Sequence, residues 1–194
     1  MKKTIHTILL GLLTLVLLFG LLSATVSAAP AIDASVENED QLIEAVQNAP
    51  DDSTSYIIEL NEDISLTGSL NIPSGKNITL ISGPNGPFAL IGTNGEETIV
   101  VEGKLTLGTS PKSQNGIIVT HNENDLGRGV TVDNGGALIL NCGEISGNTA
   151  DESDYSGGGV FANEGSFDMF GGAISNNTVL YINSATYGGG VSVG

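Results

Sequence analysis

Residues able to do catalytic chemistry are scarce along this chain. Beyond residue 28 there is one histidine, His121, one cysteine, Cys142, and no tryptophan. A Ser-His-Asp arrangement would have to use His121, and a zinc site with several histidine or cysteine ligands is excluded. We interpret His121 as a tolerated turn residue. We predict that Cys142, after the apolar run 137–140, is a buried, reduced and inert thiol; pairing of two chains through it is the alternative.

Carboxylates are the other groups that could do chemistry, and two loops concentrate them. One loop contains Asp51 and Asp52, and the other spans residues 151–154, with the sequence Asp-Glu-Ser-Asp. Calcium needs several oxygen ligands that converge on one point, so either loop could contribute. Neither loop has the spaced Asp/Asn pattern with glycine of an EF-hand. Solvated loop charge is therefore the simpler interpretation, and a calcium-stabilised binding module is an alternative.

A polysaccharide-active enzyme is a further alternative. A hydrolase needs two opposed carboxylates, and a lyase needs a base together with cations that face the uronate carboxylate. Only four basic residues follow residue 28, namely Lys76, Lys104, Lys112 and Arg128. No predicted strand carries a clear carboxylate pair, because Asp168 has Ile139 as its counterpart one repeat earlier. We therefore assign no catalytic or cofactor-binding residue and no cofactor, and leave a metal site open.

The N-terminal segment indicates where the protein is located, and its net charge limits the partners that it can bind. Lys2 and Lys3 precede an apolar run over 8–22 and the small residues 26–28, the layout of a signal peptide that is cleaved after Ala28. We expect a secreted or cell-surface protein without membrane insertion after cleavage. The remaining 166 residues suit one domain and carry 22 acidic against four basic residues, a net charge of −18. Such a field repels nucleic acid and disfavours acidic polysaccharides.

One helix is predicted near the start of the mature chain. Residues 29–38 are expected to form an exposed leader. From Asn38 to Asn48 acidic residues occupy the first turn, Leu42, Ile43 and Val46 share one face, and Pro50 ends the pattern. We expect this helix to cover the first coil that the strands after Pro50 form.

After Pro50 the hydrophobic period changes to two, which indicates short strands between tight turns. The alternating pairs are Ile58/Leu60, Ile64/Leu66, Leu70/Ile72 and Ile78/Leu80. We take Ile58, Ile78 and Ile99 as equivalent positions of two coils of 20 and 21 residues.

From residue 99 the strands repeat. The units begin at Ile99, Val130, Val160 and Val191, that is, 31, 30 and 31 residues apart. Each full unit holds two alternating aliphatic pairs and one further aliphatic residue, so it predicts three strands that bury a core only when stacked on an identical unit. The fold class is therefore all-β, a right-handed parallel β-helix (solenoid) over 39–194 with a short N-terminal capping helix. Residues 191–194 only begin a unit, so we expect the domain to be C-terminally incomplete or to end in an open coil.

The glycine motifs of the repeats carry a resemblance. They are the triplets at 157–159 and 188–190, each followed by valine, and Gly-Gly-Ala-Ile at 171–174. This pattern resembles bacterial cell-surface β-helix repeat proteins, such as the GGAI-type repeats of polymorphic outer-membrane proteins and adhesin-like proteins. The resemblance covers 99–194 well and 39–98 loosely. It implies a secreted or wall-associated structural or adhesive module that binds an unknown surface ligand, a glycan or a partner protein, and it implies no catalytic site.

Two further sets of side chains are placed by the repeat. Asn122, Asn148 and Asn177 each follow an aliphatic residue by three positions, so we expect their amides to stack as a ladder. Phe167 and Met169 are expected to point inward, and Phe170 outward under a covering loop. An exposed Phe170 near Tyr155, Tyr181 and Tyr187 is the alternative, because such a cluster would suit stacking on a sugar.

Overall fold

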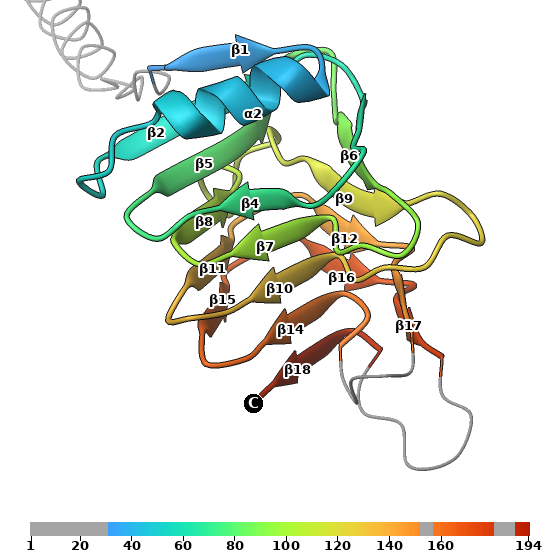
Figure 1. The fold of residues 1–194 in the computed structure, drawn as a ribbon. Helices are drawn as coiled ribbons and strands as arrows, with labels where there is room; N and C mark the ends of the chain where they lie inside the picture. The colour runs from blue at the N-terminus through green and yellow to red at the C-terminus, as the bar shows by residue number, and fades with distance from the viewer. Residues whose placement is uncertain (1–30, 152–156, 181–188) are drawn as a thin grey trace, which may run out of the picture. The chain divides into compact units, whose positions relative to one another are not determined.

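The computed structural model describes residues 31–151, 157–180 and 189–194. The predicted signal peptide, most of the acidic loop at 151–154, and Tyr155, Tyr181 and Tyr187 lie outside the described residues. The described part forms one compact unit. It is nearly all β, and its parallel sheets form a solenoid of about four turns with one short helix near the N-terminal side (Figure 1).

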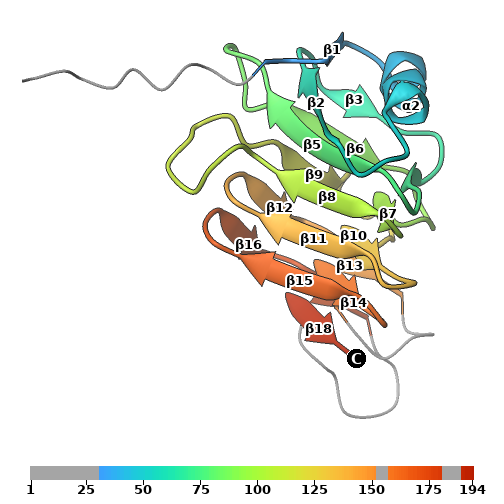
Figure 2. The same cartoon turned by 90° about the vertical axis from the view of Figure 1, so that its left-hand side faces the viewer.

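Three sheets run along the solenoid, and each coil contributes one strand to each of them (Figures 1 and 2). The first contains β1 (Ala34–Val36), β2 (Ser55–Leu60), β5 (Asn77–Ser82), β8 (Lys104–Leu107), β11 (Ala137–Leu140) and β15 (Ser166–Met169). The second contains β3 (Ile64–Ser65), β6 (Ala89–Gly92), β9 (Ile118–His121), β12 (Glu144–Ser146) and β16 (Ala173–Ser175). The third contains β4 (Leu70–Ile72), β7 (Ile99–Val101), β10 (Val130–Val132), β14 (Val160–Ala162) and β18 (Val191–Val193). A small fourth sheet pairs β13 (Thr149–Ala150) with β17 (Thr178–Val179).

The register of the third sheet confirms the predicted repeat. Ile99 pairs with Val130, Val130 with Val160, and Val160 with Val191, all in parallel strands. Alternation then places the same positions inward in every coil, where Ile99, Val130 and Val160 are fully buried. Burial of each such aliphatic side chain contributes about 1.5–3 kcal/mol, so stacking of coils is the main source of stability.

The register of the first coils differs from the prediction. Ile58 pairs with Leu80, while Ile78 pairs with Leu105 in the first sheet. Ile99 belongs to the third sheet and pairs with Leu70. The assumed equivalence of Ile58, Ile78 and Ile99 is therefore wrong. Similar aliphatic pairs occur on every side of the coil, so spacing alone did not distinguish one side from another.

The predicted exposed leader is also wrong over residues 34–36. These residues form β1, which pairs in parallel with β2 through Ala34 and Ile58. Val36 is buried in the core. One alternation of two small apolar residues is a weak strand signal, which explains why the sequence did not predict this strand.

Helix α2 (Glu39–Asn48) confirms the predicted helix. Asn38 is its N-cap and accepts a hydrogen bond from the backbone N–H of Gln41 at 3.1 Å. Leu42 and Val46 are buried, as expected. Ile43 was expected on the same buried face, but it is 38 % exposed, and Ala45 is buried instead.

The buried side chain of Lys76 stabilises the other end of α2. Its ammonium donates to the carbonyl of Gln47 at 2.9 Å and to the carbonyl of Ala49, and it forms an ion pair with Asp51 at 2.8 Å. A cation at this position satisfies carbonyls that the helix leaves without partners and complements the negative end of its dipole. The first coil is thereby joined to the helix that covers it.

Candidate functional site

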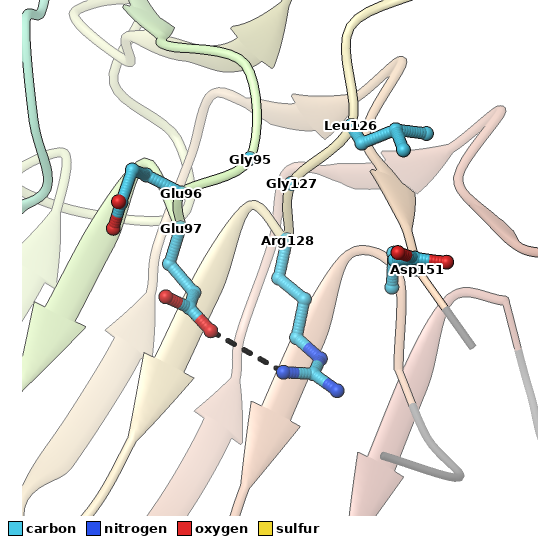
Figure 3. A pocket seen from close by; sticks show the side chains of 8 residues that line it. Gly95, Glu96, Glu97, Leu126, Gly127, Arg128 and Asp151 are labelled. Carbon is cyan, nitrogen blue, oxygen red and sulfur yellow. Dashed lines mark hydrogen bonds and ion pairs between the residues drawn. The ribbon is translucent and has the colours of Figure 1, made fainter. Parts of the chain in front are cut away.

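A pocket of about 260 Å³ lies where turns from three successive coils meet (Figure 3). One turn precedes β7, one precedes β10, and the third segment includes and follows the end of β13. The lining residues are Gly95, Glu96, Glu97, Leu126, Gly127, Arg128, Ala150 and Asp151. Loops of this kind commonly carry binding residues on a rigid scaffold.

Backbone hydrogen bonds between coils hold the walls of this pocket. The N–H of Gly95 donates to the carbonyl of Leu126 at 2.6 Å, and the N–H of Leu126 donates to the side chain of Asn94 at 2.8 Å. The N–H of Gly127 donates to the carbonyl of Thr149 at 2.8 Å. The pocket is therefore formed by the fold itself and does not depend on a ligand to arrange its walls.

Arg128 is the one basic residue among the residues that line the pocket. Its guanidinium is buried, donates to Glu97 at 3.3 Å and lies 5.2 Å from the centre of the Phe161 ring. Figure 3 shows Glu97 directed toward Arg128, whereas the carboxylate of Glu96 is turned away and Asp151 lies on the other side of the guanidinium. The pocket thus offers carboxylate acceptors beside one fixed cation, a combination suited to a polar ligand that both donates and accepts hydrogen bonds.

His121 lies behind this pocket and is not the turn residue predicted from the sequence. It ends β9 and is buried. Its Nε2 lies 3.0 Å from the carbonyl oxygen of Glu96, and its Nδ1 lies 2.8 Å from Oδ1 of Asn148. Both ring nitrogens therefore contact groups of the fold. The ring positions the backbone of a pocket residue and leaves no nitrogen directed at a substrate.

The amide ladder is confirmed for two of its three predicted members. The Nδ2 of Asn148 donates to Oδ1 of Asn177 at 2.9 Å, and the Nδ2 of Asn177 donates to the carbonyl of Ile145 at 2.8 Å. Asn122 is not part of the ladder, because its amide donates to Asp125 within the same turn at 3.1 Å. His121 takes that place above Asn148.

The acidic loop at residues 51 and 52 is engaged in local contacts. Asp51 pairs with Lys76. Asp52 accepts hydrogen bonds from Thr54, which lower the pKa of its carboxyl below the ordinary value. Within the described part of the chain, no group of three or more His, Cys, Asp or Glu side chains converges as a metal site would require.

The exposed aromatic residue corrects another expectation. Phe170 was expected to lie under a covering loop, but it is 63 % exposed. Phe167 and Met169 occupy the inward register positions opposite Leu138 and Leu140. Asp168 lies opposite Ile139, as the sequence comparison of the repeats indicated, and has no carboxylate partner there.

Cys142 is buried, as predicted. Its sulfur lies 3.1 Å from the hydroxyl of Ser113 and 3.7 Å from the amide oxygen of Asn115. Both contacts come from the loop that precedes β9, so this loop covers the thiol.

The pocket was not predicted from the sequence. The signal that could have indicated it is the position of Glu97 and Arg128, each two residues before the first strand of successive repeats.

Among the described residues no helix is long and apolar enough to cross a membrane. Comparisons with protein-family models, curated proteins and solved structures found no match.

Proposed function

We propose that this protein is an extracellular structural or adhesive module that binds a glycan or partner protein without catalysing a reaction. The proposal extends to a bacterial cell-surface protein, because the glycine motifs around 157–190 resemble the GGAI-type repeats of such proteins. A secreted or surface location is supported by the charged, apolar and small-residue segments of positions 1–28.

The observation that carries the proposal is that the scarce reactive residues already have structural partners. His121 and Asn148 stack two coils, and Cys142 is buried under a loop. Glu97 is paired with Arg128. A general acid or base needs a side chain whose reactive atom can contact a substrate proton. The reactive atoms of His121, Cys142 and Glu97 contact other groups of the protein instead.

The pocket around Arg128 is the proposed contact point for the ligand. Three acidic residues and one arginine line the pocket, so its net charge is negative and an anionic ligand would be repelled. A neutral polyhydroxylated ligand fits better, because sugar hydroxyls can donate to the carboxylate of Glu97 and accept from the guanidinium of Arg128. The net charge of −18 after residue 28 means that the whole molecule also repels anionic ligands.

Binding of the chain from residue 29 onward to a panel of neutral and acidic polysaccharides, with and without calcium, tests this proposal. We expect retention on a neutral polysaccharide that calcium does not change. Glu97→Gln should weaken retention, and the exposed Glu123→Gln, which makes the same charge change outside the pocket, should not. Absence of binding to every polysaccharide and to surface proteins would contradict the adhesive function.

A polysaccharide hydrolase is the second candidate. The observation in its favour is that Glu96, Glu97 and Asp151 line one pocket, since hydrolysis uses two carboxylates on opposite sides of the scissile bond. Release of reducing ends that depends on Glu97 would support it in place of the adhesive proposal.

A further inference from the structure

The ring of His121 has a hydrogen-bond acceptor close to each of its two nitrogens. Its Nε2 lies 3.0 Å from the carbonyl oxygen of Glu96, a group that can only accept. Its Nδ1 lies 2.8 Å from Oδ1 of Asn148. A neutral imidazole carries one N–H and can donate to only one of these two oxygens, whereas an imidazolium donates to both. The charge that suits the site therefore depends on which amide atom of Asn148 faces the ring.

The backbone fixes the orientation of the Asn148 amide. The backbone N–H of Asn148 lies 3.1 Å from one side-chain atom of Asn177, and because an N–H can only donate, that atom is Oδ1. The other atom, Nδ2, then donates to the carbonyl of Ile145. The Asn148 atom that lies 2.9 Å from this Oδ1 and 3.2 Å from the carbonyl of Val119 must in turn be the donor Nδ2. Oδ1 of Asn148 therefore faces His121, and rotation of the amide cannot offer the ring a donor.

Charged side chains do not decide the charge of the ring. The segments packed around it carry Glu96, Glu97, Glu123, Asp125, Arg128 and Asp151. Glu97 is paired with Arg128, and Asp125 accepts a hydrogen bond from Asn122. Among the described residues, the further contact of the ring is the hydroxyl of Thr98, 3.3 Å from Nδ1, and no carboxylate lies within hydrogen-bond distance of either nitrogen. The two facing oxygens are thus the groups that favour one protonation state over another.

Glycine backbone encloses the ring beside the pocket. His121 is 6 % exposed, and a Cβ atom on Gly92 or Gly127 would collide with its Nε2. A Cβ atom on Gly127, which lines the pocket, would also collide with the carbonyl oxygen of Glu96. Water is therefore kept from the hydrogen bond between His121 and Glu96, and the ring has no room to turn. A buried charge persists only where such enclosed partners replace water.

We propose that the fold holds His121 as an imidazolium and that loss of one proton to solvent releases the carbonyl of Glu96, a wall of the pocket around Arg128. Asn148 is fixed by its ladder contacts, so Nδ1 keeps its proton and its shorter hydrogen bond. Nε2 then presents a lone pair to the carbonyl oxygen, and the two acceptors repel each other. Glu96 lies in a turn, where the backbone can move away. The pocket wall responds to protons in this way whether or not a glycan is the ligand.

Nitrogen NMR of the ring tests the protonation state directly, because His121 is the one histidine after residue 28. The chain from residue 29 onward is labelled with ¹⁵N and titrated from about pH 5 upward until the ring loses a proton. We expect both ring nitrogens to carry a proton at the acidic end, and Nδ1 alone to carry one after the titration. A ring that is already neutral at about pH 5, or a neutral ring with its proton on Nε2, would overturn the proposal.

Amide hydrogen exchange tests the release of the pocket wall. The protection of the Gly95 and Glu96 amides, relative to the unfolded chain at the same pH, should fall by about fivefold when the ring becomes neutral. The amide of Lys76, which closes a turn of an earlier coil, should keep its protection. His121→Gln should abolish the change at Gly95 and Glu96, and the exposed Glu123→Gln should retain it. Unchanged protection of both pocket amides in the wild type, or an equal fall at Lys76, would overturn the proposal.

Discussion

At the level of single residues, the inward aliphatic positions were predictable and the polar ladder was only partly so. Strand β9 pairs with β6 over four residues, up to Gly92 and His121. It therefore continues one residue further than β12, and alternation turns His121 inward. In the next coil Gly147 has a φ of 70°, which ends the strand and brings Asn148 to that place. Both Asn122 and Asn148 lie three residues after an aliphatic residue, so this spacing could not show that His121 takes the inward position in one coil and Asn148 in the next.

The ladder leads to the first prediction. Asn148→Ala should lower the free energy of unfolding by at least about 2 kcal/mol, because the carbonyl of Val119 loses the amide donor of Asn148 and the buried Nδ1 of His121 keeps only its longer contact with the hydroxyl of Thr98 at 3.3 Å. Asn122→Ala removes an amide of the same kind from an exposed turn and should cost no more than about 0.5 kcal/mol. Urea unfolding of the two variants measures both values. Equal losses would contradict the contact between His121 and Asn148.

The second prediction concerns Cys142. Its burial under the loop that contains Ser113 should make labelling of the native protein by a thiol reagent slow, while denaturant should make it rapid. Ser110→Cys adds a thiol at an exposed position of the same loop and provides a control that reacts at once. Rapid reaction of Cys142 in the native wild type would contradict this account of the loop.

At the level of elements, the long repeats were predictable because each has the same three strands at nearly the same spacing. The first coils were not, since β1 carries only two apolar side chains and the pairs at Ile58 and Ile78 suit any side of a coil. The role of Lys76 at the end of α2 depends on a contact across 27 residues of sequence, so no local pattern indicated it.

The third prediction tests how closely the coils stack. A Cβ atom on Gly136 would lie 2.3 Å from the carbonyl oxygen of Val101 in the preceding coil, so Gly136→Ala must separate the two coils. We expect a loss of about 1–3 kcal/mol in the free energy of unfolding. Gly68→Ala, where a Cβ meets no atom within 4 Å, should change stability by no more than about 0.5 kcal/mol. A neutral Gly136→Ala variant in thermal or urea unfolding would show that the coils are less tightly stacked than described.

At the level of the whole molecule, the sequence indicated the solenoid but not the pocket. The core repeats once per coil, so its positions are visible as a period. The pocket is built once, from Glu97, Arg128 and Asp151 in three turns that differ in sequence, and only the stacking of coils brings them together. The same stacking uses His121 and Asn148 for structure, which is why binding without catalysis is the function we propose.

The most direct test of that claim is a product assay under conditions where binding is saturated. The chain from residue 29 onward is incubated with each polysaccharide that retains it, and reducing ends and unsaturated uronates are measured over time. Our account predicts retention of the protein with no release of either product above the level of a protein-free control. Reproducible release that Glu97→Gln abolishes and Glu123→Gln leaves intact would contradict it and identify the pocket as the active site of a polysaccharide-degrading enzyme.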